Sequence, residues 1–95
     1  MSYYVILSRV GAGSFDGPGQ FKEVAKKVAE EIRSSCPGLR IRHSFSTLGH
    51  YDVVDIVETD DPSQVEKAAM IIRSVGRSET EVLYATPWQE FLARL

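Results

Sequence analysis

The chain of 95 residues lacks the features that mark several classes of protein. It has one cysteine, Cys36, which excludes an internal disulfide. No apolar run approaches the ~20 residues of a membrane-spanning helix. The segment Met1–Ile6 carries no basic leader, so we expect no signal peptide. The net charge is −2 with both signs interspersed, which disfavours nucleic acid and membranes as partners. We therefore predict a cytoplasmic protein.

Motifs for cofactors and metals are also missing. In the glycine-rich segment 11–19, the third glycine comes one position late for a dinucleotide-binding fingerprint, and no Gly-Lys-Ser/Thr follows. We interpret this segment as a flexible lid over a cleft between helices and sheet. The two histidines, His43 and His50, have no cysteine or carboxylate at metal-ligand spacing. We predict neither a cofactor nor a metal ion.

Apolar periodicity indicates an α+β protein made of one domain, 1–95, with a core over 3–86 and an amphipathic tail over 87–95. The expected strands are 3–10, 39–48, 51–59 and 80–86, and the expected helices are 20–34 and a second one that starts at Pro62. The order β-α-β-β-α-β is typical of the ferredoxin-like fold, with a four-stranded antiparallel sheet.

The second helix has the clearer boundaries. Asp61 suits the N-cap, Pro62 the first helical position, and Gln64 the place where a capping box expects Glu or Gln. Gly76 is a good C-terminal stop. The expected buried stripe consists of Val65, Ala68, Ala69, Ile72 and Val75.

The expected central strands, 3–10 and 51–59, are apolar on both sides. The two helices can cover only one face of the sheet, and leaving several hundred Å² of the other face wet forgoes on the order of 10 kcal/mol. We therefore predict a homodimer that pairs sheet against sheet and closes a barrel. The alternative is that the tail 87–95 folds over its own sheet.

The strands 39–48 and 51–59 are expected to form a hairpin around Gly49-His50, a two-residue loop in which Gly49 takes a positive φ. The resulting register places His43 diagonal to Glu58. A histidine–carboxylate pair can act as a general base, although mutual structural satisfaction is the simpler interpretation. The residues expected on that side are Ile41, His43, Phe45, Thr47, Asp52, Val54, Ile56 and Glu58. On the other side, we expect Asp55 to form an ion pair with Arg42.

The stretch Gly49-His50-Tyr51-Asp52-Val53-Val54, followed by Ile56-Val57-Glu58 and Asp60-Asp61-Pro62, resembles the GYD domain family. Gly49, Tyr51 and Asp52 hold the three residues that give the family its name. The resemblance covers about residues 3 to 86, and it implies a prokaryotic subunit of the dimeric α+β barrel kind with no established general function. Related barrels include cofactor-independent monooxygenases and small isomerases, but their catalytic motifs are not matched here.

The leading functional hypothesis is a dimeric module that binds a small apolar or aromatic ligand in a cleft between helices and sheet. The candidate ligand-binding residues are His43, Tyr51, Asp52 and Glu58. One alternative is a small-barrel enzyme of the monooxygenase or isomerase type, with catalytic residues undefined. Another is a non-catalytic module for self-assembly or regulation.

Overall fold

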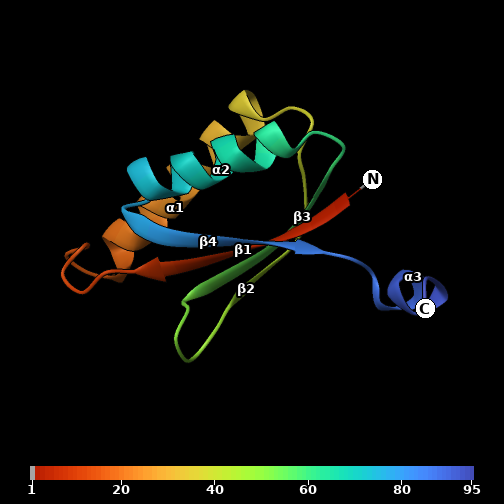
Figure 1. Ribbon diagram of the computed structural model, residues 1–95. Coiled ribbons are helices and arrows are strands. Elements are labelled where there is room, and N and C mark those ends of the chain that lie inside the picture. Colours follow the sequence, from red (N-terminus) through yellow and green to blue (C-terminus); the bar gives the residue numbers. More distant parts are fainter. Residues whose placement is uncertain (1) are drawn as a thin grey trace.

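Seven elements of secondary structure follow one another in the computed structural model, which describes residues 2–95. They are β1 (Ser2–Val10), α1 (Pro18–Ser35), β2 (Arg40–Ser46), β3 (Val53–Thr59), α2 (Pro62–Ser74), β4 (Ser78–Ala85) and α3 (Trp88–Ala93). The strands form one antiparallel sheet in the order β2-β3-β1-β4, with β1 and β3 in the middle. Figure 1 shows α1 and α2 on one face of this sheet and no helix on the other. The predicted α+β ferredoxin-like fold is confirmed.

The hydrophobic core lies mainly between the sheet and α2. Ile6 of β1 and Val57 of β3 point toward the helices and are each 1% exposed. The predicted stripe of α2 meets them, with Val65, Ala68, Ala69 and Ile72 buried. In α1, by contrast, Ile32 is the only buried residue. This helix packs against α2 rather than closely against the strands, so its earlier turns stand away from the sheet.

The start of α2 follows its sequence signals in part. The Asp61 side chain caps the helix, because its Oδ1 accepts hydrogen bonds from the Ser63 backbone N–H at 3.0 Å and from the Ser63 hydroxyl at 2.8 Å. Gln64 does not complete a capping box. Its Oε1 instead accepts a hydrogen bond from the backbone N–H of Gly38 at 3.2 Å, which ties the turn after α1 to the start of α2.

The end of α2 depends on two neighbouring residues with different roles. The left-handed conformation expected at a helix end is held by Arg77, whose φ is 52°. Gly76 is buried, and its role is close approach: a Cβ atom there would lie 2.4 Å from the carbonyl oxygen of Ile72. Glycine is therefore required at position 76 because there is no room for a side chain, rather than because of a positive φ.

The hairpin between β2 and β3 departs from the prediction in two ways. Its loop is longer than two residues, because the backbone N–H of Thr47 bonds to the carbonyl oxygen of Asp52 at 3.0 Å and closes residues 48–51. Gly49 does have the expected positive φ, 126°. A bulge between Ile41 and His43 shifts the register, so Ile41 faces the helices and not the side that carries His43.

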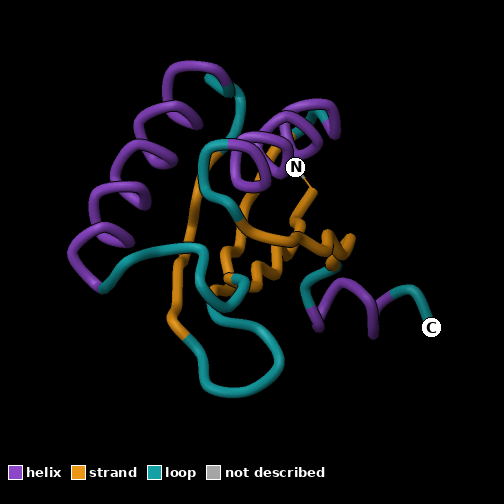
Figure 2. Tube along the Cα trace, turned by 90° about the vertical axis from the view of Figure 1, so that its left-hand side faces the viewer, coloured by secondary structure: helices purple, strands orange, loops and turns teal. Residues whose placement is uncertain are grey.

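The C-terminal tail forms α3, which extends away from the sheet and from the other helices (Figures 1 and 2). It leaves its apolar side chains in solvent: Trp88 is 66% exposed and Leu95 88%. The alternative in which the tail covers its own sheet is therefore wrong. A tail of two turns that leads away from the end of β4 leaves the second face of the sheet bare.

Candidate functional site

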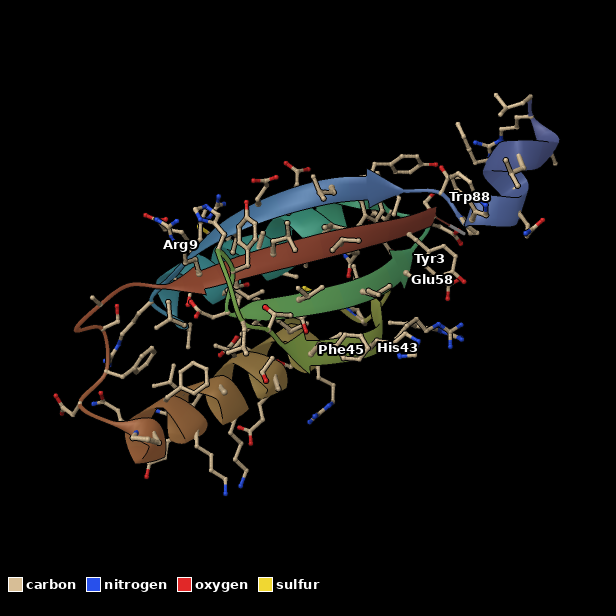
Figure 3. The ribbon with its side chains drawn as sticks, turned by 90° about the horizontal axis from the view of Figure 1, so that it is seen from below. Tyr3, Arg9, His43, Phe45, Glu58 and Trp88 are labelled. Carbon is tan, nitrogen blue, oxygen red and sulfur yellow. The ribbon has the colours of Figure 1, made fainter. Side chains whose placement is uncertain are left out.

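The uncovered face of the sheet is the first candidate site. We call it the open face, and it carries the side chains of β1 and β3 that alternate with the core residues. Its middle is apolar, and apolar residues of the two outer strands extend it. The apolar residues of the open face are Val5, Leu7, Phe45, Val54, Ile56 and Leu83, all half-buried or exposed. Figure 3 shows this face from below, with Phe45 and His43 along β2.

Charged side chains line the two outer strands of the open face. On β2, Arg40 and Arg42 flank the apolar middle, and Arg42 donates to the Glu58 carboxylate from Nε at 2.8 Å and from Nη2 at 2.6 Å. This pairing holds the pKa of Glu58 below its ordinary value. On β4, Glu79 and Glu81 make the opposite edge acidic. The open face is therefore apolar in the middle, basic at β2 and acidic at β4.

Two of the predicted site residues, His43 and Glu58, lie on the open face but are not paired with each other. The His43 ring stacks on Phe45 with centroids 5.9 Å apart, while Glu58 is held by Arg42. The expected ion pair between Arg42 and Asp55 was also wrong. These two residues lie on opposite faces of the sheet, because the bulge turns Arg42 toward Glu58. The geometry therefore offers no His43–Glu58 general base.

The other two predicted site residues hold the hairpin in place. Asp52 accepts a hydrogen bond from the backbone N–H of Val10 at 2.7 Å, and its own N–H donates to the carbonyl oxygen of Ser8 at 2.9 Å. The Tyr51 hydroxyl donates to Glu81 at 2.6 Å, which raises the pKa of the tyrosine. Tyr51 and Asp52 therefore fasten the hairpin loop to β1 and β4, and a structural role accounts for both.

A cavity on the opposite side of the sheet is the second candidate site. It has a volume of about 300 Å³ and lies between α1 and the strands, where α1 stands away from the sheet. Its walls are mainly apolar and include Val24, Ala25 and Val28 of α1 with Val53 of β3. A cleft between helices and sheet was expected from the sequence, and this cavity is that cleft. None of the four predicted ligand-binding residues lines it.

Four polar side chains that were not assigned to the cavity from the sequence line it: Ser8, Ser44, Asp55 and Ser78. The Ser78 hydroxyl donates to the carbonyl oxygen of Gly76 at 2.9 Å. The Ser44 hydroxyl donates to Oδ1 of Asp55 at 2.5 Å. Burial nevertheless raises the pKa of Asp55, and the bond from Ser44 only partly opposes this. Ser8 is 3% exposed, and its Oγ has no hydrogen-bond partner within residues 2–95.

The mouth of the cavity is formed by the glycine-rich segment that was interpreted as a lid. Phe15 of this segment packs edge-to-face on Phe21 of α1, with centroids 5.3 Å apart, and both rings line the cavity. Arg77, which follows α2, holds the segment through two contacts. Its guanidinium lies 5.4 Å from the Phe15 centroid and donates to the Ser14 carbonyl oxygen at 3.2 Å. The position of the segment agrees with a lid, and its flexibility stays a prediction.

Two classes of site are not seen in the part of the chain that the structure describes. Within residues 2–95, no group of three or more histidine, cysteine, aspartate or glutamate residues could hold a metal ion. No helix in the same range is long and apolar enough to cross a lipid bilayer. The cytoplasmic location and prokaryotic origin remain predictions.

Comparison with known proteins identifies the family. The chain is 30% identical over 99 residues to the "Glutamine synthetase and cystathionine beta-lyase binding protein" of Thermus thermophilus, and the match covers 100% of this chain and 99% of that one. The solved structure of the de novo designed protein Foldit4 aligns with a TM-score of 0.53 at 16% identity, over 90% of this chain and 96% of that one, which supports the fold alone. The model of the GYD domain family matches residues 4–95. The resemblance noted in the sequence is confirmed, and the chain belongs to the GYD domain family.

Proposed function

We propose that this protein is a protein-binding module that forms a homodimer through its open face and docks onto a metabolic enzyme. One observation carries the proposal. The accessible surface is 6438 Å² for a mass of 10.6 kDa, roughly 1,000 Å² more than a compact monomer of this mass exposes. In a standard protein–protein interface each partner buries about 800 Å² of accessible surface. The excess surface of this chain is similar to that area.

The apolar middle of the open face favours a second copy of the chain as its occupant. A twofold axis parallel to the strands lays β2 of one copy over β4 of the other. The basic pair Arg40 and Arg42 lies at one end of β2, whereas the acidic pair Glu79 and Glu81 lies toward the opposite end of β4, so this axis does not bring the two pairs face to face. The apolar middle meets itself across the axis. The support for a second copy is therefore the apolar middle of the open face, and not its charges.

The dimer is tested by substituting Leu83, which is 43% exposed on β4 of the open face. Leu83→Lys should convert the dimer to a monomer in sedimentation velocity at micromolar concentration, because it places two charges in an apolar interface. Met70→Lys is the matched control, since Met70 is 55% exposed on α2, on the side of the sheet away from the open face. A wild-type chain that sediments as a monomer contradicts the dimer.

Docking onto an enzyme is supported by the relative from Thermus thermophilus, whose printed name describes binding to glutamine synthetase and cystathionine beta-lyase. We assign this contact to α3, because Trp88, Phe91 and Leu92 stay exposed on a helix that its own chain does not cover. Exposed tryptophan is a frequent source of binding energy at interfaces.

The docking test uses the two purified enzymes from the protein's own organism, immobilised for interferometry. Trp88→Ala should weaken binding by about tenfold or more, as expected for an interface hot spot. Met70→Ala should bind like the wild type, and both variants should remain dimers. The docking proposal fails if neither enzyme binds the wild-type dimer at micromolar concentration. The assignment to α3 fails if an enzyme binds and Trp88→Ala is without effect.

We propose as a second function that the cavity beneath α1 binds a small apolar or aromatic ligand. Its volume of about 300 Å³ is at the lower end of ligand pockets, and its walls are largely apolar. A thermal-shift screen with small aromatic compounds tests this proposal. Stabilisation by at least one compound, abolished in Ala29→Phe, which fills the cavity from α1, is the expected result. The proposal is refuted if no compound stabilises the wild type.

A further inference from the structure

The polar side chains on the floor of the cavity define the chemistry of a ligand more closely than its apolar walls do. Ser8 and Asp55 lie on neighbouring strands and face the same way, because Ser8 is opposite Val53 and Asp55 is two residues further along β3. Such diagonal positions on one face of an antiparallel pair are close enough for one small group to reach both side chains. Ser44 lies directly opposite Asp55 on β2 and completes a short polar row across three strands.

Some hydrogen-bond donors and acceptors of this row have no partner within the described chain. Asp55 accepts from the Ser44 hydroxyl through Oδ1, and within the described chain that is the only hydrogen bond of its side chain. Ser8 Oγ can donate and accept, yet it is buried without a partner. Buried polar groups in folded proteins nearly always have partners, so an unpartnered hydroxyl on a cavity wall marks a place where a ligand atom fits.

We propose that the cavity binds a small apolar molecule that carries one hydroxyl group, placed between Asp55 and Ser8. This inference rests on the second proposed function and specifies the ligand chemistry. The ligand hydroxyl donates its proton to the free carboxylate oxygen Oδ2 of Asp55 and accepts a hydrogen bond from Ser8 Oγ. Its hydrocarbon part lies against the apolar wall of α1, with the rings of Phe15 and Phe21 at the mouth.

The row also excludes other ligand classes. A carboxylate or phosphate at the same place would meet the Asp55 carboxylate in a half-buried site, where like charges repel strongly. A hydrocarbon without a polar group fits the walls but leaves Ser8 and Asp55 unsatisfied. Phenols and aliphatic alcohols share the required hydroxyl, and the two differ in how they fill the space between Phe21 and Val53.

The experiment measures dissociation constants by NMR titration of the full chain with matched probes: p-cresol and toluene, which differ by one hydroxyl, cyclohexanol, and benzoate. The wild type should bind p-cresol about fivefold more tightly than toluene, as one net hydrogen bond allows. Cyclohexanol should bind as well, and benzoate should not. A preference for p-cresol over cyclohexanol identifies phenols as the ligand class, and the reverse preference identifies aliphatic alcohols.

The Ser8→Ala variant isolates the proposed contact. It should reduce the preference for p-cresol, because one of the two hydrogen bonds is lost and the bond to Asp55 remains, while leaving the affinity for toluene unchanged. Ser46→Ala is the matched control, because Ser46 lies opposite Val53 on β2 but does not line the cavity. Toluene that binds as tightly as p-cresol, or a preference that is undiminished in Ser8→Ala, overturns this inference but not the proposal that the cavity binds a ligand. If none of the probes binds, both the ligand cavity and the hydroxyl-bearing ligand are overturned.

Discussion

Replacing Gly76 with alanine tests how closely the chain approaches itself at the end of α2. A Cβ atom at this position would lie 2.4 Å from the carbonyl oxygen of Ile72 and 3.2 Å from Cγ2 of Val28. The first contact is with backbone in a buried turn of the helix, which cannot rotate away as a side chain can. Either α2 must unwind locally or α1 must move outward, and both changes disturb the core around Ile32.

The expected loss can be bounded from overpacking in other cores, which costs typically 1–3 kcal/mol. Because the clash involves backbone, we expect Gly76→Ala to lower the free energy of unfolding by about 3 kcal/mol. For a domain of this size that corresponds to a fall in Tm of roughly 12 to 24 °C. Urea titration followed by circular dichroism measures the change. The protein concentration must be held fixed, since the stability of the proposed dimer would depend on it.

Gly38→Ala is the control for this measurement. A Cβ atom there would meet only Gln64 side-chain atoms at 3.7 Å, which is ordinary van der Waals contact. We expect this variant to be as stable as the wild type or about 0.4–1 kcal/mol more stable, because alanine restricts the unfolded chain. If both variants unfold at the same urea concentration, the close approach at Gly76 does not exclude a side chain there.

Three further predictions concern single side chains. Asp61→Ala should cost about 1 kcal/mol by removing the N-cap of α2, and Glu66→Ala on the exposed side of that helix should cost less than half as much in the same urea titration. Burial raises the pKa of Asp55 above its ordinary 3.8, so its contribution to stability is full below that pH and is lost as the pH rises through the folded-state pKa. The stability of Asp55→Asn relative to the wild type should therefore increase as the pH rises from about 4, and a constant difference would contradict the burial argument. The hydrogen bond to Glu81 raises the pKa of Tyr51, so Glu81→Ala should lower it toward 10.0 in an ultraviolet titration.

The sequence predicted the fold well because its signals are local. The cap at Asp61, the alternation of apolar residues in the central strands and the glycine after α2 each depend on a few neighbouring residues. The bulge at β2 was missed because nothing in the residues around Arg42 marks an inserted position. That one shift was enough to send Ile41 to the other face and to replace the expected partner of Arg42 by Glu58.

The sequence predicted where the candidate site lies but not which residues form its polar part. The sequence indicates a cleft between helices and sheet, but its polar lining is formed by three serines and an aspartate from four strands that meet only in the folded sheet. Asp55 was noticed because a carboxylate among valines on a central strand needs a partner. Ser8 gave no such signal, since a serine in a strand is ordinary until its burial is known. The alternation that identified the core would have placed Ser8 beside Ile6 on the helix side.

Consecutive residues of β3 serve different surfaces. Val54 and Ile56 belong to the open face, while Asp55 between them belongs to the cavity. A single substitution in β3 can therefore change the cavity and leave the open face unaltered, or the reverse. A movement of the whole strand cannot change one surface alone, because a shift that repositions Asp55 also moves Val54 and Ile56. The proposed ligand site and the proposed dimer interface are therefore mechanically linked by a single strand.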